Sequence, residues 1–491
     1  MKTACAEILT ANLAIVGSGA CGLAAALTAA ECGAKVVVLE KQFHFGGSSN
    51  FAEGMFGVES DLQRREYVGI TRDEAFRIIM EYSHWRANPR LVRAVVDESA
   101  ETIGWLQRQG VKFLGPKAMW PDGLRVWHVL EGPHRAKGAA MNRRLVDEAT
   151  KRGVDIRLGT PVTRILKENG EITGVVAENG GETIQINSNA IIIATGGYAN
   201  NREWIKKYAG FDLGVDLFPL GNFDKTGDGI RMAWEGGGAE EGMGVLQLGR
   251  GGPVLTGVES TGLLEIACNQ PNIRINQDGL RYCDENIQPN FTFDGNALVR
   301  QRERCAYSIF DESAKRYWSD KGVDAGAGFR LLPGTRINIE EDLKKALERG
   351  SKDVFVADSL EELATKIRVD PAVLMSTVNE YNQFCDKGHD DLFAKDPLYL
   401  RPLRGPRFYA LKAYVLFIGT LGGIKINHKM EVLDHKEERI PGLYAGGLDA
   451  GGMYGDSYDL YAAGGTLGFA VNSGRIAARN ALEYVGMKTR T

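Results

Sequence analysis

The segment from Asn12 to Lys41, NLAIVGSGACGLAAALTAAECGAKVVVLEK, constrains the fold more than any other part of the chain. The apolar run at 13–16 predicts a buried parallel strand. A helix rich in small residues follows, and residues 35–39 predict a second strand that ends at Glu40. Because a GxGxxG motif joins the first strand to the helix, the sequence predicts a complete β-α-β unit.

Each glycine of the GxGxxG motif has its own physical task. Gly17 permits the tight turn, Gly19 lets the backbone approach a pyrophosphate at the helix N-terminus, and Gly22 lets helix and strand pack closely. Glu40 is placed to accept hydrogen bonds from a ribose. Glycines in a turn can be purely structural, but strand, helix, spacing and acid together indicate a bound dinucleotide.

Composition and charge narrow the class of protein further. The chain has 491 residues, of which 44% are hydrophobic and 25% charged, and this is enough for a large core in two or three domains. The formal net charge is −4, without a dense Lys/Arg block that would favour nucleic acid. We expect no membrane span and no signal peptide, and therefore a cytoplasmic protein.

The cysteines indicate what kind of redox cofactor to expect. They are scattered and form no CxxC pair, so we expect no iron-sulfur cluster, no c-type haem and no zinc site. Redox chemistry must then rest on an organic cofactor. The seven cysteines are Cys5, Cys21, Cys32, Cys268, Cys283, Cys305 and Cys385.

Further segments carry a resemblance to a known family. After the β-α-β unit come EKQFHFGGSSNFAEGMFG (40–57), AIIIATGGYANN (190–201), TGDG (226–229), RINQDGLRYCDE (274–285), GTLGGIKIN (419–427) and IPGLYAGG (440–447). In this order they resemble the fumarate reductase and succinate dehydrogenase flavoproteins over almost the whole chain. The resemblance implies FAD. It also implies that FAD is not covalently bound, because His44 precedes the GG pair and Ser49 stands nearer the position of the linking histidine.

The resemblance also implies which residues hold FAD. Leu448 stands where the family usually has a glutamate for the flavin ribityl group, and the neighbouring Asp449 is expected to compensate. The start of the terminal helix is expected to direct backbone N–H groups at the flavin. The predicted cofactor-binding residues are Gly17, Gly19, Ala20, Cys21, Gly22, Glu40, Lys41, Gly46, Gly47, Ser48, Ser49, Ala194, Thr195, Gly196, Asp228, Asp449, Gly464, Thr466 and Leu467.

The predicted fold class is α/β, a Rossmann-like FAD-binding domain with an inserted α+β capping domain for the substrate. The FAD-binding domain would comprise residues 1–245 and 420–491, and the capping domain residues 246–419. In this family the cap is mobile. Its closure would exclude water while hydride passes to or from the flavin.

The positions that bind a dicarboxylate in the family's fumarate reductases differ here. The arginine that acts as the acid falls on Pro289, and two substrate-binding histidines fall on Gly249 and Gly419. Arg250, beside one of them, is a candidate for contact with the substrate or its proton. Fumarate reduction is therefore not the favoured prediction.

The segment DSYDLYAAGGTLG (456–468) suggests a different substrate site. Tyr461 and Gly465 resemble a YPGAGxTxG segment of the 3-ketosteroid dehydrogenases, a branch of the same family. There the tyrosine hydroxyl and the glycine N–H bind the substrate's ketone oxygen. Tyr461 and Gly465 are thus the leading candidates for a carbonyl clamp, and Tyr458 is a second. The alternative is that Tyr461 only packs beneath the flavin.

The predicted function is an FAD-dependent oxidoreductase that acts on a C=C or CH–CH bond conjugated to a carbonyl, on an enone, enoate or steroid-like molecule. A first alternative is a fumarate- or urocanate-type reductase with an anion site rebuilt around Arg250, Arg135 and the tyrosines. A second is an electron-transfer flavoprotein subunit whose cap serves a protein partner. In each case the electron donor or acceptor comes from outside the chain.

Overall fold

The structure is a computed structural model that describes residues 7–119, 123–133, 136–253, 262–326 and 331–487. The chain divides into two compact units. Unit 1 comprises Met1–Phe211, Pro219–Gln247 and Ile418–Thr491, and unit 2 comprises Asp212–Phe218 and Leu248–Phe417. The sequence prediction placed the boundaries after residues 245 and 419 and did not separate the segment 212–218.

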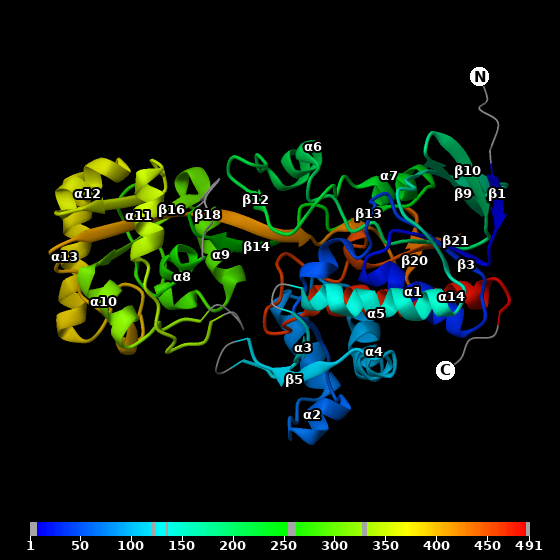
Figure 1. Ribbon diagram of the computed structural model, residues 1–491, viewed down its shortest axis with the longest axis horizontal. Helices are drawn as coiled ribbons and strands as arrows, with labels where there is room; N and C mark the ends of the chain where they lie inside the picture. Colours follow the sequence, from blue (N-terminus) through cyan, green and yellow to red (C-terminus); the bar gives the residue numbers. More distant parts are fainter. Residues whose placement is uncertain (1–6, 120–122, 134–135, 254–261, 327–330, 488–491) are drawn as a thin grey trace. The chain divides into compact units, whose positions relative to one another are not determined.

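A six-stranded sheet forms the centre of unit 1 (Figure 1). Neighbouring strands are parallel except for the first pair, which is antiparallel. The central strands, with sequences LAIV, VVVL and III, are completely buried, as expected for a parallel sheet covered on both faces. The strand order is β20 (Glu431–Leu433), β21 (Arg439–Ala445), β11 (Ile191–Ile193), β2 (Leu13–Val16), β3 (Val36–Leu39) and β7 (Asp155–Arg157).

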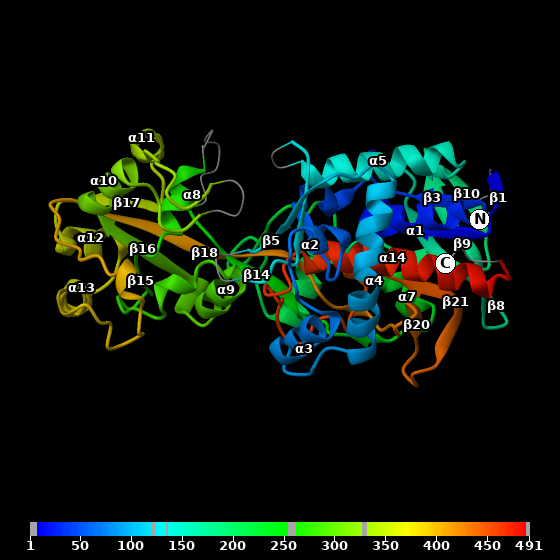
Figure 2. The same cartoon turned by 90° about the horizontal axis from the view of Figure 1, so that it is seen from below.

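Helices α1 (Ala20–Glu31) and α14 (Gly465–Tyr484) pack along each other beside this sheet, and α5 (Lys137–Lys151) also packs against α1 (Figures 1 and 2). Almost all of α1 is buried, so its alanines and glycine permit close helix contacts. Helix α4 (Pro89–Arg108) crosses α14, and it begins with Asn88 as N-cap and proline at the first position.

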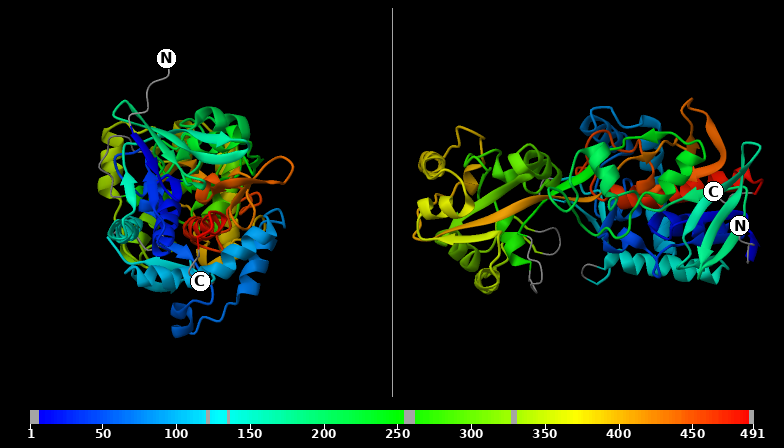
Figure 3. Two further views of the ribbon diagram at one scale, coloured as in Figure 1. Left: turned by 90° about the vertical axis from the view of Figure 1, so that its right-hand side faces the viewer. Right: turned by 90° about the horizontal axis from the view of Figure 1, so that it is seen from above.

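Three smaller sheets complete unit 1. Figure 3 shows the first of them at the N-terminal strand, in the order β1 (Glu7–Thr10), β10 (Glu182–Asn187), β9 (Glu171–Asn179) and β8 (Val162–Glu168). The others are β4 (Gly54–Phe56), β6 (Trp127–Leu130) and β5 (Phe113–Lys117), and the pair β13 (Glu240–Glu241) and β19 (Gly423–Ile424). The remaining helices are α2 (Asp61–Arg65), α3 (Arg72–Tyr82), α6 (Arg202–Trp204) and α7 (Asp228–Glu235).

Unit 2 is built around a sheet with a hydrophobic core on each face. Because side chains alternate along a strand, Phe408 and Ala410 enter one core while Tyr409 and Leu411 enter the other. The strands are β12 (Phe218–Pro219), β18 (Phe408–Thr420), β16 (Cys305–Asp311) and β15 (Ile273–Ile275), with β14 (Leu246–Gly251) and β17 (Val354–Ala357) also paired to β18. The helices are α8 (Leu263–Cys268), α9 (Phe291–Val299), α10 (Glu312–Asp320), α11 (Glu340–Glu348), α12 (Leu360–Ile367) and α13 (Pro371–Lys387).

No helix in the described part of the chain combines the length and the apolar composition that a membrane-spanning segment needs.

Candidate active site

The turn between β2 and α1 requires glycine at position 17, and the start of α1 requires it at position 22. Gly17 has a φ of +104°, and a Cβ atom there would lie 2.2 Å from the carbonyl oxygen of Ala194. A Cβ on Gly22 would lie 2.0 Å from the carbonyl oxygen of Gly17. At Gly19 a Cβ would meet only the Gly46 carbonyl oxygen, at 3.8 Å. The backbone at the start of α1 is therefore open to a ligand.

Glu40 follows β3 and carries a carboxylate with a fixed orientation. Its Oε2 accepts hydrogen bonds from the Ser18 backbone N–H at 2.9 Å and the Ser18 hydroxyl at 2.8 Å. Its Oε1 accepts one from the Gln42 N–H at 2.9 Å. A carboxylate held in this way at the end of the second strand is suited to bind ribose hydroxyls.

A cavity of about 270 Å³ opens at this edge of the sheet. Nine of the predicted cofactor residues line it, whereas Gly464, Thr466 and Leu467 at the start of α14 lie outside its lining. The nine are Gly17, Gly19, Glu40, Lys41, Gly47, Ser48, Ala194, Thr195 and Asp228.

Predicted residues behind the lining support the cavity wall. The Ala20 N–H donates to Ser49 Oγ at 3.1 Å, and Ser49 Oγ donates to the Gly46 carbonyl at 2.6 Å. These bonds hold the GG segment against the N-terminus of α1. Cys21 faces α14, with its Sγ 3.8 Å from Ser473 Oγ, and burial raises the pKa of this thiol to about 12.

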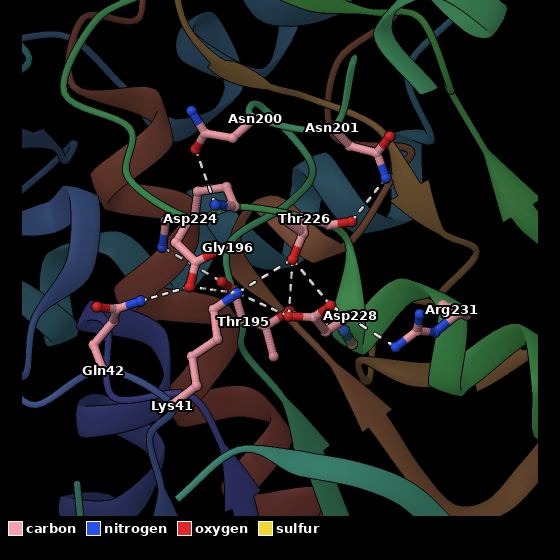
Figure 4. A network of polar contacts seen from close by, with 12 residues as sticks. Lys41, Gln42, Thr195, Gly196, Asn200, Asn201, Asp224, Thr226, Asp228 and Arg231 are labelled. Carbon is pink, nitrogen blue, oxygen red and sulfur yellow. Dashed lines mark hydrogen bonds and ion pairs between the residues drawn. The ribbon is translucent and has the colours of Figure 1, made fainter. Parts of the chain in front are cut away.

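A polar network closes one side of the cavity (Figure 4). The Lys41 ammonium lies 2.8 Å from Asp228 Oδ2 and 3.2 Å from both Asp224 Oδ2 and Thr226 Oγ1. Burial acts against ionisation of Asp228, but the hydrogen bond and charge of Lys41, together with Thr226 and Arg231, outweigh it and lower the pKa of the carboxyl. The two carboxylates thus fix the position of the Lys41 side chain at the rim.

Lys225, which the sequence prediction missed, is a second cation in the lining. Its Nζ would be 2.6 Å from a Cβ on Gly196 and 3.0 Å from a Cβ on Gly47, so it lies between two glycine turns. It donates to the Thr195 carbonyl at 3.4 Å. Burial lowers the pKa of Lys225, while the charge of Glu40 opposes this. The only signal in the sequence is a lysine directly before TGDG.

The cavity residues fit FAD. The open backbone at Gly19 and the N-terminus of α1 suit a pyrophosphate, and Lys225 adds a positive charge between the two glycine turns. Glu40 suits the adenosine ribose. These are the donors and the acceptor that a dinucleotide needs at this edge of a parallel sheet.

We expect Lys225→Gln to weaken FAD binding by roughly 10- to 100-fold, because a hydrogen bond to a charged group contributes about 1.5–3 kcal/mol. Titration of the apoprotein with FAD, followed by flavin fluorescence, measures this. Arg231→Gln is the matched control, since the exposed Arg231 lies 3.8 Å from Asp228 at the outer end of the same network. Equal affinities of Lys225→Gln and wild type would exclude contact between Lys225 and the cofactor.

Asp449 is completely buried and binds the turn that follows β11. Its Oδ1 accepts hydrogen bonds from Thr195 Oγ1 at 2.9 Å and the Gly197 N–H at 2.8 Å. Its Oδ2 accepts from the N–H groups of Thr195 and Gly196. Burial raises the pKa of Asp449 although all four bonds act to lower it. Its contacts with the protein are those of a residue that positions the turn, and the predicted contact with FAD stays a prediction.

Near the start of α14, the hydroxyl of Tyr458 lies at Gly465. Tyr458 is buried, and its Oη accepts a hydrogen bond from the Gly465 N–H at 3.1 Å. Tyr461 is 37% exposed, and its ring packs edge-to-face against Tyr82 with 5.8 Å between centroids. The sequence favoured Tyr461 as the partner of Gly465, whereas in the structure the Tyr458 hydroxyl is bonded to Gly465. The catalytic roles of both tyrosines stay predictions.

Asp459 and Tyr454 are further buried groups that the sequence prediction did not single out. Asp459 Oδ1 accepts hydrogen bonds from the N–H groups of Tyr461 at 2.7 Å and Ala462 at 3.2 Å. Within the described part of the chain, its Oδ2 and the Tyr454 hydroxyl are buried without a partner. Burial raises the pKa of Asp459 to about 7. The sequence did contain a signal for Asp459. This acid stands between Tyr458 and Tyr461, just before the glycines that begin a helix.

The raised pKa of Asp459 predicts a pH-dependent stability. Below the unfolded pKa of about 3.9 the carboxyl is protonated in both states. Between that pH and about 7 only the folded state keeps the proton, so the free energy of unfolding falls as pH rises. We expect Asp459→Asn to lack this fall, which is about 1.4 kcal/mol for each unit of raised pKa.

Urea unfolding of the FAD-loaded wild type and Asp459→Asn at about pH 5 and pH 8 measures the difference. The variant should gain stability relative to wild type as the pH increases. A difference that is the same at both pH values would show that the pKa of Asp459 is not raised.

Arg250 lies on β14 in unit 2 and is buried. Its Nη1 donates to the Cys268 carbonyl at 3.1 Å and to Asn269 Oδ1 at 2.7 Å, and its Nη2 lies 3.3 Å from Cys268 Sγ. Among the described residues its Nε has no partner. These contacts hold the guanidinium in place, and contact with a substrate stays a prediction. Arg135 is outside the described residues.

Leucine side chains occupy the space beside Gly249 and Gly419, the two positions where the family resemblance implies histidines. A Cβ on Gly249 would lie 3.0 Å from Leu416 Cδ1, and a Cβ on Gly419 would lie 2.8 Å from Leu448 Cδ1. A larger side chain at either position would therefore have to displace the terminal methyl group of its leucine.

Comparison with known proteins establishes the family. Residues 12–467 match the FAD binding domain family. The chain belongs to this family. A vinyl phenol reductase of Lactiplantibacillus plantarum is 35% identical over 483 residues, which cover 96% of each chain. A fumarate reductase (cytochrome) of Shewanella frigidimarina is 27% identical over 479 residues, covering 97% of this chain and 77% of the relative.

Solved structures agree on the fold. A flavocytochrome c3 fumarate reductase in an open conformation matches with a TM-score of 0.73 and 25% identity, over 98% of this chain and 79% of that one. A 3-ketosteroid Δ1-dehydrogenase of Sterolibacterium denitrificans matches with a TM-score of 0.77 and 22% identity, over 96% and 99% of the two chains. These comparisons confirm the predicted family, fold class and FAD cofactor. They also confirm the prediction that the protein is an FAD-dependent oxidoreductase acting on C=C bonds.

Proposed function

We propose that this protein reduces a C=C bond that is conjugated with an oxygen atom, in a small molecule of the vinylphenol or enone class. The single observation that carries the proposal is the Tyr458 hydroxyl at the Gly465 N–H, at the first residue of α14. The two histidine positions of a dicarboxylate site are glycines here, which argues against fumarate. The 35% identity with a vinyl phenol reductase supports a vinylphenol as the first substrate to test.

A vinylphenol and an enone share the feature that this site would recognise. In both, the oxygen carries negative charge at one stage of the reduction. Hydride addition to an enone moves negative charge onto the carbonyl oxygen, and a proton then adds to the neighbouring carbon. In a vinylphenol, a deprotonated oxygen donates charge, so the terminal vinyl carbon takes up a proton first and the benzylic carbon then accepts the hydride. The Tyr458 hydroxyl, which accepts from the Gly465 N–H and so keeps its own hydrogen free to donate, can stabilise such an oxygen together with the positive end of α14. Bound FAD would supply the hydride.

The observation that favours the alternative, a fumarate- or urocanate-type reductase, lies in unit 2. Arg250 Nε is a buried donor that lacks a partner among the described residues, as a carboxylate site would require. An electron-transfer subunit is the other alternative. In all three cases we infer an external electron donor or acceptor, and a cytoplasmic location remains part of the proposal.

The proposal is tested by reoxidation of the reduced flavin. The FAD-loaded protein is reduced anaerobically with dithionite and mixed separately with 4-vinylphenol, a simple enone, a 3-keto-4-ene steroid, urocanate and fumarate. We expect fast reoxidation by the vinylphenol or an enone. Fast reoxidation by fumarate or urocanate alone would establish the anion-site alternative. Reoxidation only by a redox protein would establish the subunit.

Single-residue variants then locate the clamp. We expect Tyr458→Phe to lower the reoxidation rate by roughly 10²- to 10³-fold, the usual effect of removing one oxyanion donor. Tyr461→Phe is the matched variant three residues away, with a partly exposed side chain. A large loss in Tyr461→Phe and none in Tyr458→Phe would restore the original prediction from the sequence. FAD content and absorbance spectra check that both variants are folded.

A further inference from the structure

The loop before α14 contains more buried polar groups than a carbonyl clamp needs. Asp459 is 4% exposed and Tyr454 is 7% exposed, and Asp459 Oδ2 and Tyr454 Oη are buried. Neither atom has a hydrogen-bond partner in the part of the chain that the structure describes. Buried polar groups are nearly always paired in folded proteins, so two such atoms in one loop need an explanation.

The geometry places these groups around the first residue of α14. A Cβ on Gly465 would lie 3.1 Å from Tyr454 Oη and 3.6 Å from Tyr458 Oη, so both hydroxyls converge on that residue. The two rings lie 5.6 Å apart between centroids. Asp459 directly follows Tyr458 in the chain. Three groups that can carry a proton are thus collected at one helix start.

The carboxyl of Asp459 has one oxygen that is fixed and one that can hold a proton. Two backbone N–H groups bind Oδ1 and so set the orientation of the carboxyl. Oδ2 makes no such bond within the described chain, and it is therefore the oxygen that would be protonated. A buried neutral carboxylic acid is stable where a buried unpaired carboxylate is not.

We propose that Asp459 holds, as a carboxylic acid, the proton that the reduction consumes, and that a bound water carries it from Oδ2 to the Tyr454 and Tyr458 hydroxyls, which relay it toward the substrate. The water is part of the proposal because Oδ2 makes no direct hydrogen bond within the described chain. This inference rests on the proposed function. For each C=C bond reduced, one hydride from the cofactor forms one C–H bond, and one proton forms the other. The O–H bond of Asp459 breaks in that step, and the resulting carboxylate is reprotonated from water.

Asp459 would supply a proton that the family's expected acid position cannot supply in this chain. Pro289 stands where the family's acid arginine is expected, and its side chain cannot carry a proton. Asp459 acts through the tyrosines and is thus a positioning and proton-storing residue. Burial raises its pKa to about 7, near the pH at which a general acid works best.

Several other titratable groups lie near this loop. Burial raises the pKa of Tyr454 and raises that of Tyr458 to about 12, and the charge of Asp459 adds to both shifts, so both hydroxyls keep their protons near neutral pH. From α3 and the turn after it come Tyr82, which packs on Tyr461, and His84 and Arg86, which both pair with the exposed side of Asp456. Asp459 is therefore the group whose titration near pH 7 would control the relay.

The test follows the pH dependence of single-turnover flavin reoxidation with the best substrate found above. Because Asp459 must be protonated, we expect the wild-type rate to fall as the pH rises through about 7. Asp459→Asn should be slower by roughly 10²- to 10⁴-fold and should lose this fall. Asp459→Glu should restore part of the rate together with a fall at a shifted pH.

Asp456→Asn is the matched control, because this carboxylate lies in the same loop and pairs only at the surface among the contacts described. It should keep the wild-type rate and pH profile. FAD content and the thermal midpoint identify a variant that has not folded. A wild-type rate and profile in Asp459→Asn would overturn the proposal.

A second measurement does not depend on turnover. Infrared difference spectra of the FAD-loaded protein between about pH 5 and pH 9 should show a carboxylic-acid C=O band that disappears with an apparent pKa near 7 and is missing in Asp459→Asn. Without this band, Asp459 does not store a proton and the inference fails even if the enzyme reduces its substrate. With the band but no turnover of any substrate, the proposed function fails, and the relay fails with it.

Discussion

The buried carboxylate of Asp449 holds the centre of unit 1 together. It accepts four hydrogen bonds from residues 195–197, more than 250 positions earlier in the chain. The turn that it fixes begins at Ala194, whose carbonyl closes over Gly17. One ionisable side chain therefore ties the last part of the chain to the strand that ends beside the dinucleotide turn. A buried carboxyl is tolerated here because backbone N–H groups satisfy both of its oxygens.

That arrangement brings the polar groups of the cavity to one edge of the sheet. Gly17, Glu40 and Thr195 follow the carboxyl ends of three neighbouring parallel strands. Parallel strands place such ends side by side, which is why residues remote in sequence share one cavity. Lys41 and Lys225 bring two amino groups to the same edge, so we expect an anionic cofactor to meet both oriented dipoles and two lysine side chains there.

Sequence reasoning succeeded where a repeating pattern or a glycine motif sets the geometry. The β-α-β unit from 12 to 41 could be predicted because burial, helix length and turn glycines all agree. The choice between Tyr458 and Tyr461 could not, because the loop from 450 to 464 has no period that fixes where a side chain points. Lys225 was missed for a similar reason, since a lone lysine in a polar loop gives no signal until folding places it among glycines. The segment 212–218 joins unit 2 through contacts that are distant in sequence.

The two glycine–leucine pairs, Gly249 with Leu416 and Gly419 with Leu448, couple the size of one residue to the rotamer of another. A side chain added at either glycine would meet the terminal methyl group of its leucine, at 3.0 Å for Gly249 and 2.8 Å for Gly419. Because this methyl group ends a flexible side chain, the leucine can make room by changing its rotamer. The local surface at each position is therefore set by two residues together, and a substitution at the glycine would move the leucine as well.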